Sequence, residues 1–295
     1  MKRLTRREFL AAGAAAATLA GGDAARGQTP PRTAADLVPL GKTGIKTSRL
    51  GLGTGSQGGQ VQRDLGQAGL DYLVRYAYDR GIRYVDTADA YRIHGMLKSA
   101  LQRLPREELF LQTKIGIPDA KNVRACLDRF RTELGTDYLD SVLIHCTTTS
   151  DWPDQLKQMR DDLAAAKDQQ VIRAHGTSIH GLKSLSVAPD CDWIDIALVR
   201  VNPQGKHVDG PTGQWDEPGD LPQALEQIRR LHTAGSGVIG MKIIGNGSFT
   251  DAADRETSIQ YVMGLDCVDA VVIGFASTRE IDEALDRINR ALAGT

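Results

Sequence analysis

From residue 37 onward, the chain alternates between short aliphatic runs and longer amphipathic segments, with a period of roughly 30 residues. The runs rich in aliphatic and β-branched residues predict eight strands: Ser48–Gly53, Ile82–Thr87, Leu109–Ile115, Leu139–His145, Ile172–Ser178, Ile194–Val201, Val238–Ile243 and Ala270–Ala276. Apolar residues that recur every three or four positions predict helices between them: Leu70–Arg80, Asn122–Leu134, Asp154–Lys167, Leu221–His232, Asp251–Met263 and Ile281–Leu292. The sequence therefore predicts a chain of strand–helix units.

An α/β fold with eight such units favours a closed barrel over an open sheet. Closure removes both sheet edges, and every connection between parallel strands keeps the same hand. We therefore expect one domain, a (β/α)8 TIM barrel over residues 37–292. Ahead of the first strand, Val38–Leu40 and Ile45–Thr47 flank Gly41 and Gly44, which predicts a β-hairpin. We expect this N-terminal β-hairpin to plug the bottom of the barrel.

The first 30 residues have the pattern of an export signal. After a basic start, the adjacent Arg6 and Arg7 are followed by Phe9 and Leu10, and then by a run of small, weakly apolar residues over Ala11–Ala20. This arrangement resembles the twin-arginine signal, whose export machinery carries proteins that are already folded. We therefore predict a signal peptide over residues 1–30, the twin-arginine export machinery as a partner, and a periplasmic mature protein.

Composition limits the other partners. Lys and Arg total 36 and Asp and Glu total 37, so the net charge of −1 gives no general attraction for nucleic acid or for an anionic membrane. Beyond the N-terminal segment, no apolar run approaches the roughly 20 residues that span a bilayer. The four cysteines include no C-x-x-C pair, so we expect no metal site. The expected mature protein is a monomer that binds a small molecule.

Polar side chains stand at the carboxyl ends of three consecutive predicted strands. Asp86, Lys114 and His145 end the second, third and fourth strands, and Tyr91 follows Asp86 by five residues. Active sites of such barrels lie at this end, and neighbouring strands are about 4.8 Å apart, so the four side chains are expected to converge at one mouth. Each residue taken alone fits a helix cap, a solvated lysine or a structural histidine. Their joint placement favours a catalytic site.

This group of side chains suits carbonyl reduction. A tyrosine phenol with an unperturbed pKa of about 10 is a weak acid at neutral pH, and a neighbouring ammonium such as Lys114 lowers that pKa. Asp86 is expected to keep Lys114 charged and oriented. His145 is expected to donate a hydrogen bond to a carbonyl oxygen as negative charge develops there. Tyr91 is then the proton donor.

The same residues carry a family resemblance. Asp86–Tyr91, Gln112–Lys114 and Leu143–His145 resemble the aldo-keto reductases, whose catalytic tetrad is Asp, Tyr, Lys and His in that order. The resemblance covers about residues 37–292 and implies hydride transfer between an aldehyde or ketone and NADP or NAD, a coenzyme bound across the barrel mouth without a Rossmann domain. It implies the coenzyme-binding residues Gly53, Thr54, Ser178, Met241, Lys242, Phe275, Ser277, Arg279 and Glu283.

The chain departs from the family pattern at several coenzyme contacts. Ile179 and Leu198 align where the family commonly has amide side chains that hold the nicotinamide carboxamide. Met241 replaces the aromatic ring that stacks on the nicotinamide, although a thioether can also pack on a ring face. Glu280 aligns with the arginine that grips the 2′-phosphate, and Arg279 stands beside it, so both NADP and NAD remain open.

Two functions remain after these observations. The intact tetrad favours an NAD(P)-dependent oxidoreductase, and the alternative is an exported barrel that keeps the tetrad but acts as a ligand-binding or sensing protein. Because free nicotinamide coenzyme is scarce outside the cytoplasm, an exported reductase is expected to carry its coenzyme out with it. No motif in the loop Pro203–Gly219 identifies the substrate. His94 is a further candidate for a residue that lines the site.

Overall fold

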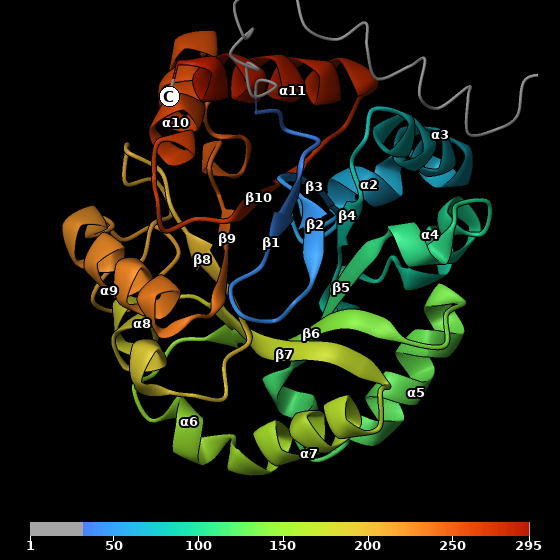
Figure 1. Cartoon of the computed structure of the whole chain (residues 1–295), viewed down its shortest axis with the longest axis vertical. Helices are drawn as coiled ribbons and strands as arrows, with labels where there is room; N and C mark the ends of the chain where they lie inside the picture. The colour runs from blue at the N-terminus through green and yellow to red at the C-terminus, as the bar shows by residue number, and fades with distance from the viewer. Residues whose placement is uncertain (1–31, 295) are drawn as a thin grey trace, which may run out of the picture. The chain divides into compact units, whose positions relative to one another are not determined.

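The computed structural model describes residues 32–294, so the predicted signal peptide lies outside the described residues. Eight parallel strands close into a barrel in the order β10-β3-β4-β5-β6-β7-β8-β9 (Figure 1). The strands are β3 (Leu50–Gly53), β4 (Tyr84–Asp86), β5 (Phe110–Gly116), β6 (Leu139–Thr147), β7 (Ile172–Ile179), β8 (Ile196–Arg200), β9 (Gly237–Met241) and β10 (Ala270–Gly274). The predicted (β/α)8 barrel is confirmed, with small shifts at the strand ends.

Helices form a ring around the barrel (Figure 1). They are α2 (Gln60–Asp64), α3 (Gly66–Asp79), α4 (His94–Leu101), α5 (Val123–Leu134), α6 (Trp152–Gln155), α7 (Lys157–Asp168), α8 (Leu182–Val187), α9 (Leu221–Ala234), α10 (Ala252–Met263) and α11 (Thr278–Ala293). The helix predicted over Asp154–Lys167 is divided, because Leu156 leaves helical geometry between α6 and α7. Helix α5 ends at Gly135, whose left-handed backbone is the conformation that a C-terminal glycine cap provides.

The N-terminal hairpin closes the bottom of the barrel. β1 (Leu37–Pro39) and β2 (Lys46–Ser48) pair antiparallel, as predicted, and lie across the centre of the strand ring in Figure 1. Val38, Leu40 and Ile45 join inward-facing strand residues in one apolar cluster. Leu40 is fully buried, so hydrocarbon seals this end of the barrel. The polar end of the barrel is the opposite mouth.

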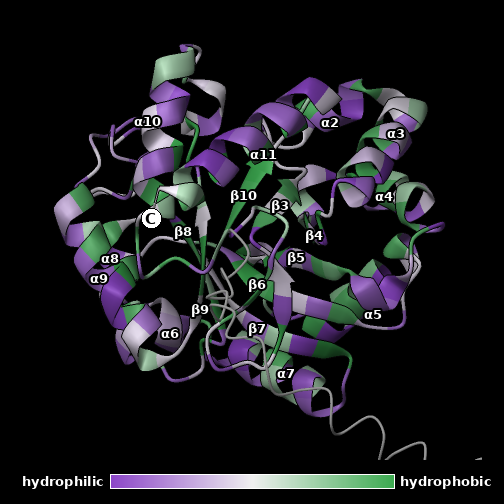
Figure 2. Cartoon of the chain, turned by 45° about the horizontal axis from the view of Figure 1, so that its top comes forward, coloured by the Kyte–Doolittle hydropathy of each residue, from purple (hydrophilic) through white to green (hydrophobic). Residues whose placement is uncertain are grey.

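The strands carry apolar side chains on both faces, because the barrel interior covers one face and the helices cover the other. β10 is hydrophobic along its length, whereas the surrounding helices show both hydrophilic and hydrophobic stretches (Figure 2). Helix α11, for example, buries Ile281, Leu285 and Ile288 and leaves Asp286 and Arg290 exposed. Within residues 32–294, no helix has both the length and the apolar character that crossing a bilayer requires.

Candidate active site

Alternation of side chains along the barrel strands brings polar groups to the mouth. Tyr84 and Phe110 face inward in the apolar cluster. Asp86 on β4 and Lys114 on β5 follow them by even numbers of residues, so they face inward too. His145 occupies the corresponding position on β6. The structure therefore places three of the four predicted catalytic residues on one arc of neighbouring strands.

Lys114 and Asp86 form a buried ion pair on this arc. We call it the closed pair, because the Lys114 ammonium donates three hydrogen bonds within it and its surroundings. The Lys114 ammonium donates to Asp86 Oδ1 at 2.7 Å, to Asp86 Oδ2 at 2.8 Å and to the Thr87 carbonyl oxygen at 2.8 Å. Gln112 Nε2 donates to Asp86 Oδ1 at 2.9 Å. Both charged side chains are buried, and the three bonds of the ammonium hold it in one position.

Tyr91 lies against this pair. It ends the 3₁₀ turn η1 (Asp89–Tyr91), and the Lys114 ammonium is 5.1 Å from the centre of its ring. A β-carbon at Gly55 would lie 2.6 Å from Tyr91 Cζ and 2.7 Å from its hydroxyl oxygen. Arg63 also donates a hydrogen bond to the Tyr91 carbonyl oxygen. Residue 55 must therefore be glycine for the phenol to occupy this position.

Burial and neighbouring charges together determine the protonation of these groups. By itself burial lowers the pKa of the Lys114 ammonium, but Asp86 and Tyr91 together raise it above its ordinary value. Burial raises the pKa of the Tyr91 phenol, and the opposing effect of Lys114 is smaller. Lys114 thus acts in the predicted direction, but the predicted net lowering of the Tyr91 pKa is wrong. A phenol that keeps its proton at neutral pH suits a proton donor.

An irregularity in β6 positions His145. The register of β6 against β7 shifts after Ile144, and Cys146 has a left-handed backbone with a φ of 63°. The His145 ring meets the Tyr91 ring edge-on, with 5.6 Å between the ring centres. Burial, reinforced by nearby lysines, lowers the pKa of His145 to about 3. His145 is therefore neutral at physiological pH and can donate one N–H group.

A cavity of about 650 Å³ opens beside these residues and extends to the N-terminus of α11. Its lining contains two catalytic candidates and seven predicted coenzyme residues: Asp86, Tyr91, Gly53, Met241, Lys242, Phe275, Ser277, Arg279 and Glu283. Lys114 and His145 are not among the lining residues. A cavity that joins Tyr91 to a helix N-terminus fits an extended dinucleotide, because helix N-termini favour phosphate groups.

The other two predicted coenzyme residues, Thr54 and Ser178, are buried and do not line this cavity. Thr54 Oγ1 donates to a backbone carbonyl of β4 at 3.0 Å, and Ser178 Oγ lies 2.9 Å from His180 Nε2. Ile179 is fully buried in the core between strands and helices, whereas Leu198 lines the cavity. The missing amide at Leu198 therefore bears on coenzyme binding, and Ile179 faces away from it.

Charged residues at the α11 end of the cavity are paired with one another. Glu283 accepts hydrogen bonds from Arg255 at 2.7 Å and from Arg287 at 3.0 Å. Glu280 accepts from the backbone N–H of residue 276 at 2.7 Å, and its own N–H donates to the side chain of the N-cap residue Ser277, so Glu280 belongs to the N-terminal cap of α11. Arg279 is exposed. The sequence did not predict that Arg255 and Arg287 would line this end of the cavity.

Sequence reasoning also missed a second polar group at the mouth. Arg200 ends β8 at an inward position and donates to His180 Nδ1, just beyond β7. The His180 ring lies 6.3 Å from the His145 ring, between ring centres. Asp209 Oδ1 lies 3.6 Å from an Arg200 nitrogen. Alternation along the predicted sixth strand contained the signal that Arg200 faces inward.

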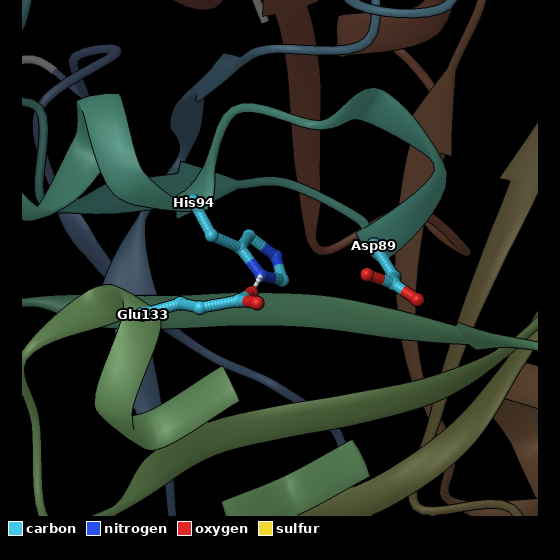
Figure 3. A group of neighbouring side chains, drawn as sticks. All are labelled: Asp89, His94 and Glu133. Carbon is cyan, nitrogen blue, oxygen red and sulfur yellow. Dashed lines mark hydrogen bonds and ion pairs between the residues drawn. The ribbon is translucent and has the colours of Figure 1, made fainter. Parts of the chain in front are cut away.

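His94 does not line the cavity, and it belongs to a salt-bridge cluster. Its Nδ1 lies 3.0 Å from Glu133 Oε2, and its Nε2 lies 3.0 Å from Thr113 Oγ1. Asp89, His94 and Glu133 come together from separate elements, with one ligand-type atom of each within 4.8 Å of the others (Figure 3). Arg129 pairs with both carboxylates, and both His94 nitrogens have partners. These contacts already use the groups that a metal ion would need.

Comparison with known proteins identifies the class to which this fold and site belong. Residues 49–293 match the aldo/keto reductase family, so the chain belongs to that family, as the resemblance indicated. A solved structure of an aldo-keto reductase homologue from Pseudomonas aeruginosa superposes with a TM-score of 0.71 at 25% identity, covering 88% of this chain and 97% of that one.

Curated relatives match over shorter stretches. Probable aldo-keto reductase 1 of Glycine max is 28% identical over 218 residues, which make up 60% of this chain and 61% of that protein. An NADH-specific methylglyoxal reductase of Escherichia coli is 29% identical over 170 residues, or 48% of this chain and 51% of that protein. The chain thus spans roughly half to three-fifths of the length of these relatives.

Proposed function

We propose that this protein reduces aldehydes or ketones with NADPH or NADH, and that Tyr91 is the proton donor. The observation that carries the proposal is the Tyr91 phenol, which keeps its proton and lies against the closed Lys114–Asp86 pair beside a cavity that suits a dinucleotide. Membership of the aldo/keto reductase family supports the same type of reaction.

The chain's own residues handle the proton and the developing charge. The coenzyme, when bound, supplies the hydride that adds to the carbonyl carbon. Tyr91 transfers its phenolic proton to the carbonyl oxygen, and the Lys114 ammonium stabilises the phenolate that remains. His145, which is neutral, donates a hydrogen bond to the same oxygen as it gains charge. The product is the alcohol, and Tyr91 regains its proton from water.

The cavity lining indicates how the coenzyme is held. Met241 and Leu198 line the cavity together with Tyr91, so they are expected to contact the nicotinamide. Arg279 and Glu280 stand at the other end, where the phosphates and adenosine are expected. Their charges are opposite, and Glu280 is engaged in the α11 cap. We therefore expect only a modest preference for NADPH over NADH.

Turnover by the purified protein tests this proposal. Benzaldehyde and methylglyoxal are each incubated with NADPH or NADH, and coenzyme oxidation is measured together with the alcohol formed. Equal amounts of oxidised coenzyme and alcohol support the proposal. A folded protein that binds coenzyme but forms no alcohol from a broad carbonyl panel would contradict it, and would favour the ligand-binding alternative.

We also propose that the chain is exported in the folded state by the twin-arginine route and works in the periplasm. The Arg6–Arg7 pair and the small-residue run after it support this route. Replacing Arg6→Lys and Arg7→Lys together is expected to leave the precursor in the cytoplasm, as cell fractionation would show. Unchanged export of the double variant, or export that stops only when the general secretory pathway is blocked, would overturn the assignment.

A further inference from the structure

Two cations share one aromatic ring at the barrel mouth, apart from the closed Lys114–Asp86 pair. Arg200 ends β8, and Lys242 directly follows β9. The ring of Trp215, from the loop between β8 and α9, has its centre 5.4 Å from the Arg200 guanidinium carbon and 5.2 Å from the Lys242 ammonium. We call Arg200, Lys242 and Trp215 the open cation cluster.

The carboxyl group of Asp209 neutralises the charge of Arg200 only in part. The 3.6 Å separation between an Arg200 nitrogen and Asp209 Oδ1 is too long for a hydrogen bond. Within residues 32–294, neither Asp209 oxygen nor Arg200 Nε has a hydrogen-bond partner. Burial raises the pKa of Asp209 to about 7, so its carboxyl is only partly ionised at neutral pH. Part of the Arg200 charge therefore remains unbalanced.

The positive charge of Lys242 is neutralised even less than that of Arg200. Its ammonium donates to Asn246 Oδ1 at 2.9 Å, which is an uncharged acceptor, and in the described part of the chain it forms no ion pair. Burial, reinforced by Arg200 and Lys114, lowers the pKa of Lys242 to about 8. The face of the Trp215 ring attracts the ammonium, but more weakly than a carboxylate would. A bound carboxylate would therefore stabilise the Lys242 ammonium more than its present partners do.

The backbone holds Lys242 beside the catalytic space at some conformational cost. Its φ of 62° lies in the left-handed region, which is unfavourable for a residue with a side chain. Lys242 lines the same cavity as Tyr91 and Met241, so it borders the space where the carbonyl would be reduced. Strained residues cluster at binding and catalytic sites, because surrounding structure maintains them there.

We propose that the open cation cluster is an anion subsite that binds a carboxylate carried by the carbonyl substrate. This inference rests on the proposed reductase function and adds a substrate class, namely aldehydes or ketones with an anionic group remote from the reacting carbonyl. Lys242 makes the direct contact because it lines the cavity. Arg200, which is buried, adds positive potential, and Trp215 packs against the body of the substrate.

A coenzyme phosphate is the other source of an anion, because the same cavity extends to α11. The position of Arg200 favours the substrate. Arg200 does not line the coenzyme cavity, and it bonds to His180, whose ring lies next to that of catalytic His145. The positive potential of the cluster is therefore greatest on the side of the mouth where the carbonyl is expected.

The test compares 4-carboxybenzaldehyde with benzaldehyde in the wild type and two variants, Lys242→Met and Lys183→Met. Lys183 is an exposed residue of α8 that does not line the cavity, so its replacement makes the same charge change without removing a residue of the proposed subsite. In Lys242→Met, kcat/KM for the charged aldehyde relative to the neutral one should fall by about 10- to 100-fold, the effect of losing one hydrogen bond to a charged group. Lys183→Met should leave this ratio unchanged. An unchanged ratio in Lys242→Met would overturn the proposal.

Two binding measurements distinguish the causes of failure. Calorimetry gives the Kd for NADPH of each variant, and weaker coenzyme binding by Lys242→Met with an unchanged ratio would assign Lys242 to a coenzyme phosphate and overturn the subsite. If no variant reduces either aldehyde, benzoate and benzamide replace them in the titration. A preference for benzoate in the wild type that Lys242→Met loses would support the subsite although the reductase proposal had failed. Equal binding of the two would overturn the subsite as well.

Discussion

Two lysines at the same barrel mouth, Lys114, which is buried, and Lys242, which is half-buried, are in opposite electrostatic states. Lys114 donates three hydrogen bonds, two of them to the Asp86 carboxylate, and its pKa is raised. Lys242 donates to one amide oxygen, and its pKa is lowered to about 8. The surroundings of Lys114 therefore stabilise its charge, whereas those of Lys242 oppose the charge that it carries.

This difference in charge pairing suits the two lysines to different functions at the same barrel mouth. A complete ion pair beside Tyr91 can stabilise a phenolate without reorganising, which is the condition under which fixed charges assist a reaction most. An incompletely paired cation keeps its attraction for an incoming anion. The Lys114–Asp86 pair is thus suited to catalysis, and the open cation cluster is suited to recognition of the substrate.

The largest expected contrast between the two lysines is in stability. Lys114→Met leaves the Asp86 carboxylate buried without its cation, and breaking a buried pair in this way typically costs about 3–5 kcal/mol. Lys242→Met removes a charge that has no carboxylate partner. The free energy of unfolding should therefore either fall by less than about 1 kcal/mol or rise. Denaturant unfolding followed by circular dichroism measures both changes. Equal losses would remove the distinction between the two sites.

The next effect concerns the position of Tyr91 beside the closed pair. Gly55→Ala places a methyl group within 2.6 Å of the Tyr91 ring, so the phenol must move. A displacement of roughly 1 Å can lower kcat by about 10²-fold. Gly95→Ala in α4 is the matched control, because a β-carbon at Gly95 has no atom within 4 Å. Benzaldehyde kinetics of the two variants test this prediction, and full activity of Gly55→Ala would show that the phenol has more freedom than the structure indicates.

Anion binding should weaken as the pH rises, because Lys242 loses its proton above its pKa of about 8. The affinity for benzoate should then fall by up to about tenfold per pH unit above that value. Calorimetric titrations at several pH values measure the profile, with Lys242→Met as the comparison. A wild-type profile that matches the variant between pH 7 and pH 9 would show that Lys242 does not bind the anion.

Neighbouring groups shape the same profile and can be separated from Lys242. Asp209, with a pKa of about 7, gains negative charge as the pH rises, which also weakens anion binding but at lower pH. Burial raises the pKa of the Cys146 thiol, so its charge appears only at higher pH. Arg200 and Lys114 stay charged, and Asp86 remains paired with Lys114. The part of the profile that Lys242→Met removes is therefore the part that belongs to Lys242.

The smallest expected effect is on coenzyme affinity. Leu198 lines the cavity where the family commonly has an amide, so Leu198→Gln should strengthen coenzyme binding by about 0.5–1.5 kcal/mol through one added hydrogen bond. Ile179→Asn should give no gain, because Ile179 faces the core. Calorimetric titration of both variants with NADPH and NADH distinguishes them. Tighter binding by Ile179→Asn alone would mean that the lining has been assigned to the wrong residue.

The sequence predicts the fold well because a barrel repeats one unit. Each strand and helix has its own periodic signal, and the hairpin is marked by Gly41 and Gly44 between apolar runs. Local periodicity fails where backbone geometry changes without a change in pattern. The break at Leu156 is such a case, since the apolar spacing continues through it into α7.

Strand positions alone are enough to predict part of the candidate site. Asp86, Lys114 and His145 are assigned from strand ends alone. The pairing of Arg200 with Asp209 depends on the path of the loop that follows β8, which has no periodic signal. The protonation of Tyr91 depends on how deeply tertiary packing buries it, so the sequence shows the sign of the Lys114 contribution but not the net result.

Single-turnover reduction of benzaldehyde by Tyr91→Phe tests the central claim most directly. The variant removes the proton donor and keeps the ring, so the Kd for NADPH should be nearly unchanged. We predict that the rate constant for coenzyme oxidation, measured by stopped flow, falls by about 10²- to 10⁴-fold relative to wild type. A Tyr91→Phe protein that oxidises bound NADPH at the wild-type rate would contradict the assignment of Tyr91 as the proton donor.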